Sequence, residues 1–214
     1  VHEICRSALE APDRRIPQVP TADRRVMARI ANPLRLGVQS EQAFLLDVSQ
    51  RWDTHFTRKL AERTQSGVEG HVTVAELRAW IDEPSPMGLT KELANLVIIV
   101  WASATDRIFN DHGGPARVGV DVLGDHYEVV AQELPDAAAW SEATRRAERV
   151  LGLAGLRAEP SAVALAKLSN ELAAAATEHM RAAEALTGEL GTLAALVEHS
   201  DAARIETAAN AAAL

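Results

Sequence analysis

The longest helical pattern in the first half of the chain runs from about Ser40 to Thr64. Its apolar residues recur at steps of three or four and so share one helical face, whereas the charged residues fall largely on the other: Leu45, Val48, Trp52, Phe56 and Leu60. A shorter helix is expected over Thr21 to Ile30, because Asn32-Pro33 ends its pattern. These two helices open the predicted fold.

Two further helices are predicted between residues 73 and 105. Thr73 is followed three residues later by Glu76, which is the capping-box signature of a helix start, and Pro84 ends that helix. The next helix runs from Leu89 to about Thr105. It is apolar on nearly every side, which is typical of a central, buried helix.

The hydrophobic period changes to two after this helix. Val118, Val120 and Val122 alternate with polar or small residues, and Tyr127 and Val129 resume the alternation after Gly124-Asp125. This pattern predicts a β-hairpin. Three helices followed by a hairpin across residues 40–131 give the element order of a winged-helix-like module.

The last third is rich in alanine and predicted to be helical. Helices are expected from Asp136 to Leu151, from Ser161 to about Val197 and from Asp201 to Ala213. The 161–197 stripe is long enough to need a partner, either in a helical hairpin or in a second chain. Gly188 and Gly191 weaken it and would divide it into two helices.

These patterns predict a mainly α fold in three segments. Residues 1–39 are interpreted as an N-terminal extension with a short helix, 40–135 as the winged-helix-like module with a small β-hairpin, and 136–214 as an alanine-rich helical hairpin or bundle. The chain has 214 residues and one cysteine, enough for one sizeable core but no disulfide scaffold. The longest apolar run has seven residues, so we expect a cytoplasmic protein without a membrane span.

The sequence lacks the motifs of several enzyme classes. It has no phosphate-cradling P-loop, no dinucleotide-binding glycine motif after a strand and no nucleophile elbow. The segment His112-Gly-Gly-Pro115 is interpreted as a tight turn before the hairpin. We therefore assign no catalytic residue, no cofactor and no metal ligand, and expect this chain not to be an enzyme by itself.

Two clusters of charged residues are candidates for binding. The first is an acidic group with two histidines, for which a polar loop is the preferred interpretation and a divalent-metal site the alternative: Asp106, Asp111, His112, Asp121, Asp125 and His126. The second is the one basic concentration, a candidate interaction surface: Arg24, Arg25, Arg29 and Arg35. Arg107 is a separate interaction candidate, at the end of the buried helix where a cation suits the helix dipole.

Charge argues against DNA binding. The chain carries 22 basic and 30 acidic residues, a formal net charge of −8. Residues 71–135 alone hold 4 basic and 10 acidic side chains. The helix in the position of a winged-helix recognition helix offers only Lys91, Asn95 and Arg107 as polar contacts. We therefore expect weak or no binding to duplex DNA.

Three stretches together resemble the C-terminal part of the PglY-type proteins: Gly88 to Phe109, His112-Gly-Gly-Pro115 and Glu133 to Trp140. These are large P-loop ATPases of the phage growth limitation and BREX type 2 defence systems of actinobacteria, and the resemblance spans about residues 20–200. It implies a role in phage resistance, with ATP hydrolysis elsewhere in a larger protein.

The resemblance implies that this chain is a non-catalytic scaffold or protein-interaction domain. Its partners would be other domains of the parent ATPase and other defence-system proteins, with self-association through the 161–197 helix. Two alternatives stay open, a nucleic-acid-binding winged helix and a small metal-dependent enzyme built around the acidic loops.

Overall fold

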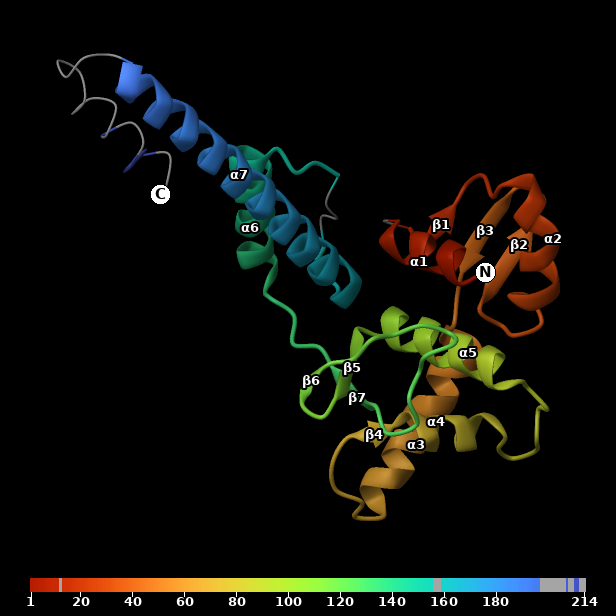
Figure 1. Cartoon of the computed structure of the whole chain (residues 1–214). Coiled ribbons are helices and arrows are strands. Elements are labelled where there is room, and N and C mark those ends of the chain that lie inside the picture. The colour runs from red at the N-terminus through yellow and green to blue at the C-terminus, as the bar shows by residue number, and fades with distance from the viewer. Residues whose placement is uncertain (12, 156–158, 197–206, 208–209, 212–214) are drawn as a thin grey trace. The chain divides into compact units, whose positions relative to one another are not determined.

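A computed structural model describes residues 1–11, 13–155, 159–196, 207 and 210–211 (Figure 1). The described residues fall into two compact units, the first formed by 1–141 and 159–165 and the second by 142–155 and 166 onward. The predicted mainly helical character is confirmed, together with two small antiparallel sheets. The three predicted segments, 1–39, 40–135 and 136–214, do not correspond one to one with these units, and as domains they stay a prediction.

The N-terminal part of the first unit packs two helices with a three-stranded sheet (Figure 1). The strand order is β1-β3-β2, antiparallel throughout. The elements are α1 (His2–Glu10), β1 (Arg15–Ile16), α2 (Thr21–Ile30), β2 (Gly37–Ser40) and β3 (Ala43–Leu46). The predicted Thr21–Ile30 helix is confirmed as α2. Residues 1–39 also contribute to the core, since Cys5, Val19 and Met27 are fully buried.

Strand β2 depends on Gly37 at its start and on Asn32 beside its free edge. A Cβ added at Gly37 would lie 2.3 Å from the Leu45 carbonyl oxygen, so no larger residue fits there. Asn32 covers the free edge of β2, because its Oδ1 accepts from the Gln39 backbone N–H at 2.7 Å and its Nδ2 donates to the Gln39 carbonyl at 3.4 Å. An exposed strand edge invites pairing with another chain, and Asn32 occupies those groups at Gln39.

The predicted helix from Ser40 to Thr64 is wrong over its first half. Residues 43–46 form β3, Ser49–Asp53 form a π-helical turn (η1), and only Thr54–Gln65 form the α-helix α3. The helical spacing from Leu45 onward was misleading: Leu45 is 46% exposed on the outer face of the sheet, whereas its neighbours Phe44 and Leu46 point into the core. Strand pairing with β2 decides the structure here.

The rest of the first unit surrounds the central helix α5 (Lys91–Ala104). It consists of α3, α4 (Val74–Ile81) and a second sheet ordered β4-β7-β5-β6, whose strands are β4 (Val72–Thr73), β5 (Arg107–Asp111), β6 (Gly114–Pro115) and β7 (Glu128–Ala131). The predicted capping box is confirmed, since Thr73 Oγ1 accepts from the Glu76 N–H at 3.3 Å and the Thr73 N–H donates to Glu76 Oε2 at 2.8 Å. The buried character of α5 is confirmed as well.

The predicted hairpin around Gly124-Asp125 is wrong. Residues 118–122 form no strand, and Val118 and Val122 are 37% and 50% exposed, so their alternation does not cover a core. Strand β7 pairs instead with β5, in the register Phe109 opposite Val129. The predicted tight turn is confirmed at residues 112–113, where it joins β5 to β6, and residues 114–115 form β6 itself.

The second unit contains most of two helices, α6 (Ala137–Leu151) and α7 (Ala162–Leu196). Both were predicted, but the division of the long helix at Gly188 and Gly191 was not correct, because α7 continues through both glycines. Ala147 and Leu168 are buried, whereas Met180 and Leu186 are 64% and 51% exposed. Apart from 207 and 210–211, the helix predicted for 201–213 lies outside the described residues.

Among the residues that the structure describes, no helix combines the length and apolar character that a membrane span requires.

Candidate functional site

The predicted arginine cluster divides into different environments. Arg24, Arg25 and Arg29 lie on α2, but Arg24 Nε donates to the Val19 carbonyl at 2.8 Å and so anchors the start of that helix. Arg25 and Arg29 are exposed and make no hydrogen bond or ion pair with any described residue. Val26 lies between them and is 43% exposed. We call Arg25, Val26 and Arg29 the α2 basic face.

Arg35 lies after the end of α2, in the segment that leads into β2. Its backbone has a φ of 55°, and its side chain is exposed. It borders a groove of about 610 Å³ that is also lined by Asp47 and Arg51. The Arg51 guanidinium lies 5.3 Å from the centre of the Trp52 ring. The groove therefore carries both signs of charge.

Arg107 is separate from the α2 basic face. It begins β5, and its guanidinium lies 5.1 Å from the centre of the Trp101 ring. Burial lowers the pKa of Arg107, an effect that the nearby Asp53 carboxylate opposes. Its Nε is buried without a hydrogen-bond partner among the described residues. Arg107 is thus a half-buried cation held against an aromatic ring.

Helix α5 is buried from Ala94 to Ala102 and again at Ala104. It packs against α1, α4 and β5. The segment after α1 also contacts the end of α5, because Arg14 Nη2 donates to the Ala104 carbonyl at 3.0 Å. A cation at the carbonyl end of a helix is favourable. Helix α1 and the segment after it therefore contact the buried helix α5.

A buried polar network fixes the loop that precedes β7. Asn95 is only 2% exposed; its Oδ1 accepts from Arg78 Nε at 2.9 Å and Nη2 at 2.7 Å, and its Nδ2 donates to the Val120 carbonyl at 2.6 Å. Arg78 also donates to the Leu123 carbonyl at 2.8 Å and forms an ion pair with Asp125. Asn95 therefore does not offer a polar contact to DNA, which corrects its predicted place on an exposed helix face. An isolated asparagine inside an apolar helix is the signal that could have identified this network.

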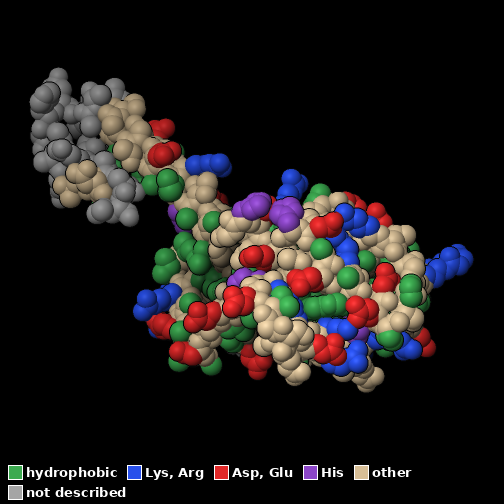
Figure 2. All heavy atoms as spheres, turned by 90° about the horizontal axis from the view of Figure 1, so that it is seen from below, with side chains coloured by type: hydrophobic (Ala, Val, Ile, Leu, Met, Phe, Trp, Pro, Cys, Tyr) green, Lys and Arg blue, Asp and Glu red, His purple; other side chains and the backbone are tan. Residues whose placement is uncertain are grey.

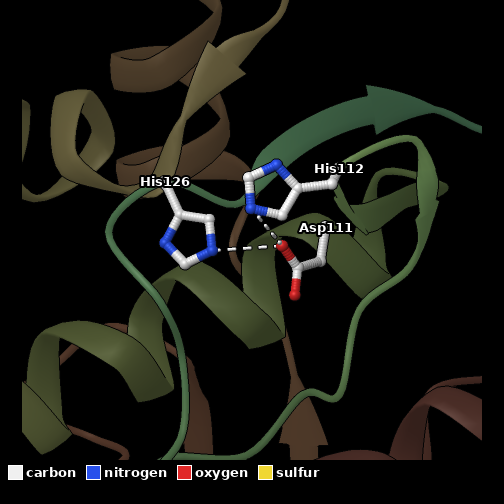
Figure 3. Close-up of side chains that lie close together, drawn as sticks. All are labelled: Asp111, His112 and His126. Carbon is white, nitrogen blue, oxygen red and sulfur yellow. Dashed lines mark hydrogen bonds and ion pairs between the residues drawn. The ribbon is translucent and has the colours of Figure 1, made fainter.

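Three members of the predicted acidic cluster lie together: Asp111, His112 and His126 (Figure 3). His126 Nε2 is 3.1 Å and His112 Nε2 is 3.5 Å from the same atom, Asp111 Oδ1. The two imidazole rings are stacked, with their centres 5.3 Å apart and 29° between their planes. All three residues are reachable from solvent. We call them the Asp-His-His cluster.

The other three acidic residues are not part of this cluster. Asp106 Oδ1 accepts from the Ala162 N–H at 2.8 Å and so caps the start of α7. Asp125 pairs with Arg78 and lies 3.6 Å from Lys91 Nζ. Asp121 is exposed in the loop. The sequence pattern identified the region that contains the cluster, but it did not distinguish Asp111, which lies beside the histidines, from Asp106 and Asp125, which stabilise the fold.

Comparison with known families identifies part of the chain. Residues 1–102 match the family described as BREX System ATPase PglY protein 5th domain. Residues 1–102 are thus similar to a domain of the PglY-type BREX proteins. The resemblance inferred from the sequence is thus confirmed, although the match begins earlier and ends sooner than the expected range of 20–200, and it does not include residues 112–115 or 133–140. It associates the chain with a phage-defence system. No solved structure matches it.

Proposed function

We propose that this PglY-type chain is a non-catalytic scaffold, a protein-interaction domain within a larger phage-defence ATPase. Two points support this proposal. The family description names an ATPase, and the sequence of this chain contains no P-loop, so nucleotide hydrolysis would reside in another part of the parent protein. Its partners would be other domains of that protein and other proteins of the defence system.

The observation that carries the proposal is the α2 basic face. Arg25 and Arg29 are one helical turn apart and exposed, and they find no partner among the described residues. Between them lies Val26, with 43% of its surface exposed. Arginine is enriched and apolar side chains are common in protein interfaces, so this combination suits a partner surface that carries carboxylates.

The topology supports a winged-helix-like module over residues 54–131. Helix α3, strand β4, helices α4 and α5, and strands β5, β6 and β7 follow one another, and the sheet order is β4-β7-β5-β6. In a winged helix that reads DNA, the helix corresponding to α5 enters the major groove. Here α1 covers α5, which favours use of the module as a scaffold.

The surface charge also favours a scaffold over a DNA-binding module. On the face drawn in Figure 2, acidic and basic side chains of the described residues are interspersed, without an extended basic region. A duplex binder relies on such a region to contact phosphates. For the nucleic-acid-binding alternative, the α2 basic face is the candidate contact surface, and a mobility shift at submicromolar protein and physiological salt would favour it.

The test uses the full-length defence protein in a host challenged with phage. The double variant Arg25→Glu/Arg29→Glu should lose protection and co-purify less with the other defence proteins, because the charge reversal repels a carboxylate-bearing partner. The control is Arg149→Glu/Arg181→Glu, two exposed arginines on α6 and α7 that also lack a partner among the described residues. Full protection by the first variant, at normal protein level, would contradict the proposal.

A further inference from the structure

The Asp-His-His cluster joins two segments that are distant in the sequence. Asp111 is the last residue of β5, His112 opens the turn into β6, and His126 lies just before β7 (Figure 3). Strands β5 and β7 pair in the register Asn110 opposite Glu128, so the end of β5 lies beside the residues that precede β7. The sheet therefore creates the juxtaposition.

Hydrogen bonds hold the backbone at Asp111 and on both sides of His126. Asp111 pairs with Gly114 in the hairpin. On both sides of His126 the carbonyl groups are occupied, since Ala75 N–H donates to Asp125 O at 3.0 Å and Val74 N–H donates to Tyr127 O at 2.9 Å. The Tyr127 ring stands edge-on to the His126 ring, with centres 5.0 Å apart. The cluster is thus supported by the sheet and by α4.

We propose that Asp111, His112 and His126 bind a divalent transition-metal ion, with Zn²⁺ as its representative. Two imidazole nitrogens and one carboxylate oxygen are ligands that zinc accepts. One potential ligand atom from each of the three residues lies within 4.8 Å of the others. Zinc–nitrogen bonds of 2.0–2.1 Å place neighbouring ligand atoms of a tetrahedron about 3.3 Å apart. The separations of 3.1 and 3.5 Å between the histidine Nε2 atoms and Asp111 Oδ1 lie on either side of that value.

The donor set selects the class of ion. Ca²⁺ and Mg²⁺ prefer oxygen ligands, whereas imidazole suits zinc, copper, iron and nickel. Three protein ligands in an exposed position leave a coordination site for water. The binding would be a property of this chain in addition to its proposed role as a scaffold, and neither depends on the other.

Among the residues that the structure describes, two potential metal ligands outside the cluster are buried or already engaged. The one cysteine, Cys5, is fully buried, and burial raises its pKa to about 12, so it offers no thiolate to the metal. His55 Nε2 lies 2.7 Å from the Trp80 carbonyl oxygen and is engaged there. His71 is exposed on the loop before β4 and serves as a matched control.

Titration calorimetry with ZnCl₂ alone, on the chain freed of metal by a chelator, tests the proposal. We expect one Zn²⁺ per chain at micromolar metal. His126→Ala and His112→Ala should each weaken binding at least about tenfold, since even outer partners of a metal ligand are worth that much. Asp111→Asn keeps the shape of the side chain and should weaken binding too, whereas His71→Ala should bind as the parent chain does.

Cobalt gives an independent readout. Co²⁺ substituted for Zn²⁺ should show the visible absorption of a four-coordinate ion in the parent chain and in His71→Ala, and lose it in His126→Ala. Circular dichroism spectra that are identical among the variants exclude unfolding as the cause. Equal Zn²⁺ affinity in the parent chain and in His112→Ala/His126→Ala would overturn the proposal, as would binding only at millimolar metal.

Discussion

Replacing Asn95 by leucine tests whether the buried network of α5 stabilises the first unit. The side chain makes three hydrogen bonds, two of them with the Arg78 guanidinium and one with the Val120 carbonyl. Leucine has a similar size but no polar atom. It therefore leaves the Val120 carbonyl and part of the guanidinium unpaired in the interior, where the Arg78 side chain is only 16% exposed.

The expected loss of stability follows from these contacts. The two hydrogen bonds with a charged group contribute about 2 kcal/mol each, and the neutral one about 1 kcal/mol. Burying leucine in place of an amide returns about 2 kcal/mol through the hydrophobic effect. The net cost is about 3 kcal/mol, which lowers the melting temperature of a unit of this size by about 9 °C.

Urea unfolding followed by tryptophan fluorescence measures this cost. All four tryptophans lie in the first unit, so the signal reports on that unit alone. The control is Lys91→Leu, four residues earlier on the same helix. The Lys91 side chain is 60% exposed and its ion pair with Asp125 lies at the surface, so the change should cost less than about 1 kcal/mol.

A double-mutant cycle separates the network from simple packing. Removing Arg78 as well, in Asn95→Leu/Arg78→Met, should cost less than the sum of the two single changes, because the second change no longer leaves a buried charge without its partner. Additive costs, or an Asn95→Leu variant as stable as the parent within about 0.5 kcal/mol, would refute this account of the network.

Four further predictions concern other parts of the chain. Arg63 pairs with Glu76 and donates to four carbonyls of the loop before β4, so Arg63→Ala should cost about 2–3 kcal/mol while the exposed Arg58→Ala costs little. Burial would raise the pKa of Glu76, but hydrogen bonds from Arg63 and Thr73 outweigh it and lower that pKa. The stability that this shift contributes is present above the ordinary pKa of a glutamate and is lost as the pH falls through the lowered pKa. Melting temperatures measured against pH should show this loss in the parent chain and a smaller one in Arg63→Ala. Leu168 is buried, so Leu168→Ala should lower the free energy of unfolding, followed by circular dichroism, by about 2–4 kcal/mol. Leu186 is 51% exposed, so Leu186→Ala should leave this free energy unchanged and alter the sedimentation of the chain only if α7 self-associates. The purified chain should not hydrolyse ATP, and turnover that a mutation within it abolishes would contradict the non-catalytic assignment.

Local sequence signals predicted helix ends well. The capping box at Thr73 and Glu76 needs only neighbouring residues, and the structure contains both of its hydrogen bonds. Thr90 begins α5 in a similar way, since its Oγ1 accepts from the Leu93 N–H at 3.4 Å. Such signals are encoded within one turn of helix, which is why a single sequence reveals them.

Strands depended on partners that the sequence does not name. Residues 43–46 become β3 because β2 and β1 pair with them on both sides. Val118 and Val122 follow the alternating pattern of a strand, but β5 and β7 pair with each other instead. The loop between them forms no strand and is held by hydrogen bonds from Arg78. Periodicity identifies a possible buried face, and only long-range pairing decides whether it is used.

The same limit applies to the candidate site. Six polar residues around this loop were equivalent in the sequence, and nothing in their spacing distinguished them. The register of β5 against β7 brings Asp111 beside His126, whereas Asp125, one residue away, turns toward Arg78. A shift of one residue in that register would bring Asp125 instead of His126 beside Asp111, so the site depends on the sheet register as well as on the residue types.

The end of the family match does not coincide with the end of a structural unit. The family match ends at residue 102, inside α5, which continues to Ala104 with its side chains buried. Strand β4 lies within the matched part and pairs with β7, with Val72 opposite Val129. Strand β7 lies beyond the match. A helix cannot be divided within its buried part, and a two-residue strand does not persist without its neighbour. The folding unit that contains the matched residues 1–102 therefore extends at least to Ala131, and the Asp-His-His cluster belongs to it.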